Sequence, residues 1–189
     1  MKKAQPFLQH GDSVGIVGIG GLGQLGVQFA AAQGYRTVAI DNHENSLQLV
    51  DDMPSHLRPK LGVNSSHPDA KDQIMQFTNG QGLAAVVVCT DPVSVTGWSL
   101  ELLRIGGVLV PLGLPPGNWQ FDTQLLLFRE LVVRGNYVAG QQEVEEMMDL
   151  VAREDIKSQL TVVQPEDIPS IPDLYRNRAF RGRLVVKCQ

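Results

Sequence analysis

The chain has 189 residues, of which 43% are hydrophobic and 19% charged, a composition typical of one globular domain with a small extension. Its net charge of −4 argues against nucleic acid or an anionic membrane as the main partner, and no apolar run reaches the roughly 20 residues that span a bilayer. The N-terminal segment lacks the apolar core of a signal peptide and there are two cysteines, so we expect a cytoplasmic protein without a disulfide framework.

Short apolar runs rich in valine and isoleucine alternate along the chain with segments of helical pattern. The predicted strands cover residues 13–20, 36–41, 60–66, 83–90, 108–114 and 131–138. The predicted helices cover residues 21–34, 44–53, 68–82, 92–107, 122–130 and 142–155. Because such alternation builds βαβ units with right-handed crossovers, we predict an α/β protein with a doubly wound, six-stranded parallel sheet.

The last part of the chain breaks this alternation. Two short apolar segments, "LTVVQ" and "RLVVKC", flank a proline-rich turn and a short helical segment. We therefore predict a main domain over residues 1–156 and a short C-terminal appendage over residues 157–189, which lies outside the main sheet.

A glycine-rich turn follows the first predicted strand. Gly18, Gly20 and Gly23 form the pattern G-x-G-x-x-G at the start of a helix, whose free N–H groups and partial positive charge favour a phosphate. Gly18 would allow the tight turn, Gly20 the close approach of a pyrophosphate, and Gly23 the close packing of helix and strand. The pattern predicts a Rossmann dinucleotide-binding fold. The alternative is a turn that keeps its glycines for its backbone shape and binds no ligand.

An acidic residue, Asp41, ends the second predicted strand. A carboxylate at this distance from the glycine turn is placed to accept hydrogen bonds from a ribose diol and to repel a 2′-phosphate. We therefore predict NAD rather than NADP as the cofactor.

Several segments in order carry a family resemblance. They are "GDSVGIVGIGGLGQLGVQFAAAQG", "TVAID", "AAVVVCT", "LLRIGGVLVPLGLPPG", "ELVVRGNYVAG" and "RGRLVVKC". In combination they resemble the cofactor-binding half of a zinc-type alcohol dehydrogenase, of the medium-chain dehydrogenase/reductase family. The resemblance covers essentially the whole chain.

The resemblance also implies roles for single residues. It places the pyrophosphate on Gly20, Gly21 and Leu22, and the adenosine ribose on Asp41. The implied contacts with the ribose or nicotinamide at the other end of the cofactor are Cys89, Thr90, Gly113, Leu114, Asn136 and Tyr137. One departure is Ser46, because the family often has a basic residue a few positions after the acid.

A second departure concerns zinc. Members of the family begin with a GroES-like catalytic domain that carries the zinc ligands, and nothing in this chain resembles it. The four histidines and two cysteines show no metal-ligand spacing, whereas a catalytic zinc needs three protein ligands and an open position. We therefore expect no zinc site in this chain.

The candidate acid–base residues are Asp91 and Tyr137. Asp91 follows the strand predicted over 83–90, and Tyr137 lies near the end of the strand predicted over 131–138, so both could reach the crevice where open α/β sheets bind their ligands. The pattern Tyr-x-x-x-Lys of short-chain reductases is absent from the sequence, and Cys89 fits a buried strand cysteine better than a nucleophile.

These observations leave three interpretations of function. The first is the NAD-binding domain of an alcohol-dehydrogenase-like oxidoreductase, without independent zinc-dependent hydride transfer. The alternative is a stand-alone Rossmann protein that uses the open crevice for a redox-neutral cyclisation or isomerisation of a small apolar substrate. A scaffold or dimerisation module is the third. We also expect a homodimer through the apolar edge strand near residues 131–138, since such an edge must be covered.

Overall fold

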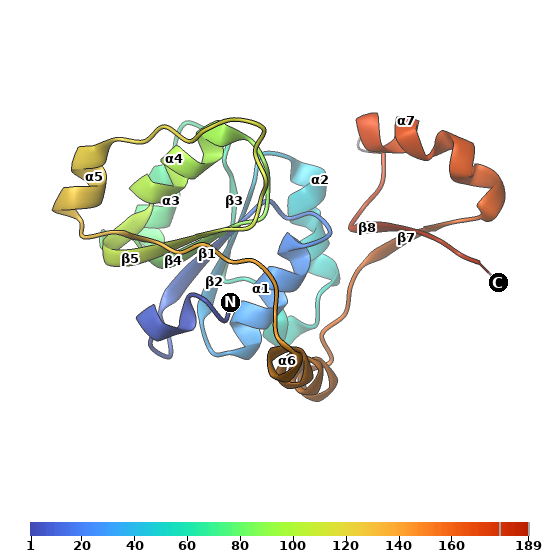
Figure 1. Ribbon diagram of the computed structural model, residues 1–189, viewed down its shortest axis with the longest axis horizontal. Coiled ribbons are helices and arrows are strands. Elements are labelled where there is room, and N and C mark those ends of the chain that lie inside the picture. The colour runs from blue at the N-terminus through green and yellow to red at the C-terminus, as the bar shows by residue number, and fades with distance from the viewer. Residues whose placement is uncertain (178, 189) are drawn as a thin grey trace.

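The computed structural model describes residues 1–177 and 179–188. Parallel strands form the main sheet in the order β3-β2-β1-β4-β5-β6 (Figure 1). The strands are β1 (Ser13–Val17), β2 (Arg36–Asp41), β3 (Leu61–Asn64), β4 (Leu83–Val88), β5 (Leu103–Pro111) and β6 (Val132–Val133). The strand order reverses between β1 and β4, and the predicted doubly wound Rossmann sheet is therefore confirmed.

Helices connect the strands. The α-helices are α1 (Gly23–Ala32), α2 (Glu44–Leu47), α3 (Ala70–Phe77), α4 (Val93–Glu101), α5 (Thr123–Phe128), α6 (Gln141–Glu154) and α7 (Ile171–Arg176). Short 3-10 helices cover Gln5–Phe7, Gln48–Asp52, Ser55–Leu57 and Pro165–Ser170. In the part of the chain that the structure describes, no helix has the length and apolar character needed to cross a membrane.

The hydrophobic core lies on both faces of the sheet. The whole of β4 is buried, and its residues alternate between two separate clusters. Val86 shares one cluster with Ile74 of α3 and Leu100 of α4. Val87 shares the other with Val27 of α1. Burial on both faces explains why the strands are continuous apolar runs, and it leaves the carboxyl ends of the strands as the place for a site.

The predicted boundary between α4 and β5 is wrong. The helix expected over 92–107 ends at Glu101, and β5 already begins at Leu103. Leu103 is fully buried and pairs with Leu83 of β4. Pairing with β4 thus overrides the helical pattern of this segment.

Two further predicted elements are shorter than expected. The strand predicted over 131–138 is regular only at Val132–Val133, because β6 pairs with β5 alone at the edge of the sheet. The helix predicted over 44–53 is a single turn, α2, followed by a 3-10 helix.

The C-terminal segment forms a second, smaller sheet, as its two apolar runs predict. The strands β7 (Leu160–Val163) and β8 (Arg183–Val186) pair in parallel, and α7 lies in the connection between them. Figure 1 shows this unit, in orange and red, beside the main sheet. We refer to residues 157–188 as the appendage. Its first residues are bonded to α1 through two buried side chains, Gln24 and Gln28.

Candidate functional site

The glycine turn between β1 and α1 is shaped by close packing at two of its glycines. Gly18 has φ +89°, and a Cβ there would lie 2.9 Å from the Cβ of Thr90. A Cβ on Gly23 would collide with the Gly18 carbonyl. These two glycines are therefore required by the fold itself.

Gly20 differs from its neighbours in the motif. A Cβ at this position would meet nothing within 4 Å, and the residue is exposed. The protein's own packing therefore gives no reason for a glycine here. A ligand that approaches the backbone does give one, because a side chain would occupy the place of a phosphate.

Asp41 lies at the carboxyl end of β2, where it is 9% exposed. One carboxylate oxygen accepts a hydrogen bond from the Ile19 N–H (2.7 Å), and the other accepts one from the His43 N–H (2.9 Å). A carboxylate has about four acceptor sites, so capacity for ribose hydroxyls remains. The same side chain thus fixes the turn and faces the ligand side.

The turn faces a cavity of about 560 Å³, which we call the turn cavity. Its lining includes Gly18, Gly20, Gly21, Asp41, Ser46 and Thr90. The appendage closes another wall with Tyr175 and Phe180, whose ring centroids are 4.7 Å apart. The volume is in the range of small-molecule sites.

A guanidinium reaches this cavity from the appendage. Arg181 lines the cavity, donates to the Gln48 carbonyl (3.1 Å) and pairs with the Asp52 carboxylate (3.0 Å). Ser46 lies on the same cavity. A basic side chain from a distant part of the chain therefore lines the same cavity as Ser46.

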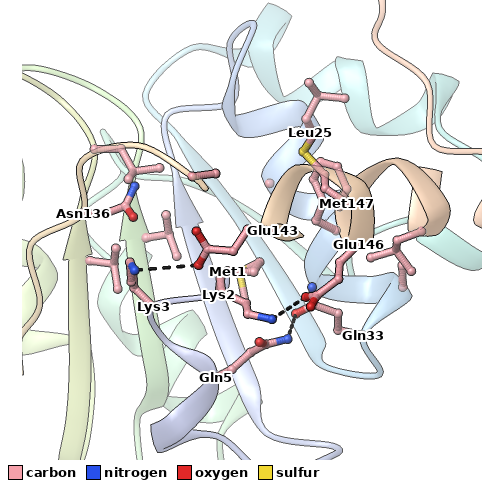
Figure 2. A pocket seen from close by; sticks show the side chains of 18 of the residues that line it. Met1, Lys2, Lys3, Gln5, Leu25, Gln33, Asn136, Glu143, Glu146 and Met147 are labelled. Atoms are coloured by element: carbon pink, nitrogen blue, oxygen red, sulfur yellow. Dashed lines mark hydrogen bonds and ion pairs between the residues drawn. The ribbon is translucent and has the colours of Figure 1, made fainter. Parts of the chain in front are cut away.

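A second cavity of about 690 Å³ lies between α1, α6 and the N-terminal segment, and we call it the α1–α6 cavity. Its lining is largely apolar, with side chains such as Leu25, Phe29 and Met147. Figure 2 shows two ion pairs at its rim, Lys2 with Glu146 and Lys3 with Glu143. Because these charges pair with each other, the cavity offers mainly apolar contacts.

The residues predicted at the nicotinamide end divide between the two cavities. Cys89, after β4, lines both, and Asn136 lines the α1–α6 cavity (Figure 2). Leu22 lines the α1–α6 cavity as well. Burial raises the pKa of the Cys89 thiol to about 12, so this side chain is neutral at physiological pH. Cys89 and Leu22 therefore lie where the two cavities approach each other.

The remaining predicted residues lie outside these linings. A Cβ on Gly113 would collide with the Thr90 carbonyl, and the Leu114 N–H donates to the Asp91 carboxylate (2.9 Å). Asp91 therefore has a structural role in holding this loop. Tyr137 is 91% exposed. Neither Asp91 nor Tyr137 lines either cavity, and their acid–base roles stay predictions.

Sequence reasoning missed Arg183, the first residue of β8. Its Nη2 lies 3.5 Å from the Gly21 carbonyl, 162 residues away in sequence. The one signal for Arg183 in the sequence is its place after Gly182 in "RGRLVVKC", one of the segments that carry the family resemblance. A cation beside a helix N-terminus adds to the attraction for phosphate.

Comparison with known proteins decides the family. The sequence model of the zinc-binding dehydrogenase family matches residues 21–153. The chain belongs to this family. The matched range begins at Gly21, after Gly18 and Gly20 of the turn, and it includes Gly23, Asp41 and both candidate acid–base residues.

The relatives of this chain include alcohol dehydrogenases. The alcohol dehydrogenase of Moraxella sp. (strain TAE123) is 32% identical over 93% of this chain and 50% of its own length. The solved alcohol dehydrogenase of Aeropyrum pernix superposes with a TM-score of 0.86 and 25% identity, over 98% of this chain and 52% of that chain. The acetophenone reductase of Geotrichum candidum, solved in complex with NAD, gives a TM-score of 0.79 and 25% identity, over 96% and 50%. The chain thus spans about half the length of these relatives, and that half has the Rossmann fold.

The family name refers to zinc, and a zinc site needs several ligands close together. Among residues 1–177 and 179–188, no group of three or more histidine, cysteine or acidic side chains is placed to hold a metal ion. The described residues instead form the glycine turn and the two cavities beside it.

Proposed function

We propose that this chain is the NAD-binding part of an alcohol-dehydrogenase-like oxidoreductase. The observation that carries the proposal is Gly20, which faces open space at the start of α1 while Gly18 and Gly23 are fixed by packing. The acetophenone reductase relative, solved with NAD, supports the choice of cofactor.

The residues around the turn indicate how the dinucleotide is oriented, with its adenosine end and its nicotinamide end on opposite sides of the turn. The pyrophosphate lies against Gly20, Gly21 and the first N–H groups of α1, where the helix dipole favours negative charge. Arg183 adds a positive charge beside Gly21. The adenosine end lies in the turn cavity with its ribose on Asp41, and the nicotinamide end extends past Cys89 toward Asn136.

The carboxylate of Asp41 selects between the two nicotinamide dinucleotides. A ribose with free hydroxyls donates hydrogen bonds to a carboxylate, whereas a 2′-phosphate is repelled by it. Asp41 is nearly buried among backbone N–H donors, so it is held in place to make this choice.

The bound dinucleotide supplies the hydride chemistry of the proposed enzyme. This chain's residues bind it, orient it and separate its two ends. We do not assign zinc-dependent hydride transfer to this chain alone, because such a step needs three protein ligands and the described residues gather no such set. No comparison supports the redox-neutral cyclisation or isomerisation, and we do not propose it.

We also propose that the chain forms a homodimer through the free edge of β6. Val133 of this strand is 38% exposed, and Phe128 of α5, just before it, is 80% exposed. An uncovered apolar edge invites pairing with a second copy. β4 and β5 separate β6 from β1 in the sheet, so this edge is not next to the glycine turn that follows β1.

Calorimetric titration with NAD and with NADP tests the main proposal. We expect NAD to bind and NADP to bind more weakly. If neither dinucleotide gives a binding signal at millimolar concentration, the proposal is overturned, because the glycine turn and Asp41 must then serve another purpose.

A further inference from the structure

Two buried glutamines on α1 hold the start of the appendage. Gln24 and Gln28 lie one turn apart and both are 0% exposed. The Gln24 amide accepts a hydrogen bond from the Gln159 N–H (2.8 Å) and donates one to the Gln159 carbonyl (3.2 Å). The Gln28 amide does the same with Lys157, at 3.1 and 2.8 Å. Each amide satisfies both backbone groups of one residue, as a neighbouring strand would.

The contacts continue from Gln159 to the glycine turn. The Gln159 carbonyl also accepts the backbone N–H of Arg183 (2.9 Å). The approach is so close that a Cβ on Gly182 would collide with this carbonyl. The Arg183 side chain then lies with Nη2 3.5 Å from the Gly21 carbonyl. A connected path thus runs from Gln24, inside α1, to a cation at the N-terminal end of the same helix.

Arg183 is exposed, so its side chain is held by little packing, and the backbone of β8 sets the point from which it reaches toward Gly21. Charge-assisted hydrogen bonds to phosphate depend on geometry, and a displacement of about 1 Å is enough to weaken a binding group. We propose that Gln24 is a positioning residue for dinucleotide binding, which fixes Arg183 beside the phosphates through the backbone of Gln159. This inference rests on the proposed function, and it concerns a residue that lines neither cavity.

Gln28 provides a matched control within the same helix. It has the same side chain, the same burial and the same pair of bonds to a backbone residue of the appendage. Its partner Lys157 precedes β7, whereas the partner of Gln24 bonds directly to Arg183. Loss of either amide loosens the appendage, but only Gln24 is on the path to the cation.

The test compares Gln24→Met with Gln28→Met, because methionine has a similar length and shape but no amide. Affinities for NAD and for adenosine are measured by calorimetry, and stability by thermal denaturation. Both variants are expected to lose similar stability, since each removes the side-chain acceptor of one backbone N–H, that of Gln159 or that of Lys157. Gln24→Met alone is expected to weaken NAD binding about tenfold, as the loss of a charge-assisted hydrogen bond would. Adenosine carries no phosphate, so its affinity should be unchanged.

A double variant separates positioning from general loosening of α1. In the Arg183→Met background, Gln24→Met should cost no further NAD affinity, because the cation that it positions is already gone. Gly182→Ala acts on the same path from the appendage side, since its Cβ displaces the Gln159 carbonyl. Its Cβ would also lie 3.1 Å from the Gln24 Nε2, so it acts on the same contacts without a change in the sequence of α1. It should give the same NAD defect, and it takes the place of Gln24→Met if that variant does not fold.

The outcomes distinguish this inference from the proposed function. Unchanged NAD affinity in Gln24→Met, an equal loss in Gln24→Met and Gln28→Met, or additive losses with Arg183→Met each overturn the positioning role alone. Failure of the unmodified protein to bind NAD at millimolar concentration overturns the proposed function, and the positioning role with it.

Discussion

Asp41 and Ile19 are 22 residues apart in sequence, yet the Asp41 carboxylate accepts a 2.7 Å hydrogen bond from the Ile19 N–H inside the glycine turn. The residue proposed to recognise the ribose therefore also fixes the turn that receives the pyrophosphate. The two roles are separable by mutation, because one depends on the charge and the other on an acceptor oxygen.

Asp41→Asn should change cofactor preference more than stability. The amide oxygen can still accept from the Ile19 N–H, although the His43 N–H then loses its acceptor. The negative charge that repels a 2′-phosphate is gone. We expect the preference for NAD over NADP to fall by about tenfold, measured by calorimetry with both dinucleotides. Asp41→Ala is the control for the structural role, and it should cost about 1–3 kcal/mol of unfolding free energy because two N–H donors lose their acceptor. An unchanged preference in Asp41→Asn would contradict the assignment of the ribose to this carboxylate.

Gly20→Ala and Gly23→Ala should behave in opposite ways. A methyl group at position 20 meets nothing in the protein, so the free energy of unfolding should stay within about 0.5 kcal/mol, while NAD binding is lost. A methyl group at position 23 collides with the Gly18 carbonyl, so this variant should be destabilised by about 3 kcal/mol or more. Chemical denaturation and NAD titration check both. Normal NAD affinity in Gly20→Ala would sink the proposed position of the pyrophosphate.

The two cysteines should differ in reactivity. Burial raises the pKa of the Cys89 thiol from 9.0 to about 12, and only a thiolate reacts readily, whereas Cys188 is exposed. A thiol reagent at neutral pH should therefore modify Cys188 quickly and Cys89 much more slowly. Two equally fast modifications of the folded protein would show that Cys89 is accessible.

The same shift gives a dependence of stability on pH. The folded-state pKa of Cys89 lies above its unfolded value, so its contribution is fully present below about pH 9 and declines as the pH rises toward 12. Denaturation curves across this range should show a smaller decline for Cys89→Ala than for the unmodified protein. Identical declines would contradict burial of the thiol.

Val133→Lys should dissociate the proposed dimer. A lysine on an edge strand opposes pairing with a second copy, and Val133 is partly exposed, so the fold should tolerate it. Light scattering after size-exclusion chromatography measures the mass. Val162→Lys, on the exposed strand β7 of the appendage, is the matched control and should remain dimeric. An unmodified protein that is monomeric at tens of micromolar would refute the dimer.

The glycine turn and the sheet were predictable because their signals are local. Alternating runs define the strands, and the spacing of Gly18, Gly20 and Gly23 before Asp41 fits one βαβ unit. The segment around Leu103 was not predictable, because its apolar residues fit a helix as well as a strand until β4 pairs with it.

The anchoring of the appendage was also hidden from sequence reasoning. Gln24 and Gln28 carry polar side chains that helical periodicity assigns to a solvent-facing surface. Their burial depends on the backbone of Lys157 and Gln159, more than a hundred residues later. Arg183 reaches the glycine turn because the appendage packs on α1, and no local sequence pattern predicts that packing.

Helix α1 faces three different neighbours, and this has a consequence for how the chain tolerates sequence change. Its first residues face the proposed dinucleotide site, its apolar side packs on the sheet through Val27, and its glutamine amides bind the appendage. A saturation library should therefore show almost no permitted substitutions at positions 23, 24, 27 and 28, the glutamines being as restricted as the core. The outer face of α6, whose residues are mostly exposed, should accept many. The number of tolerated substitutions should therefore be much lower in α1 than on the outer face of α6.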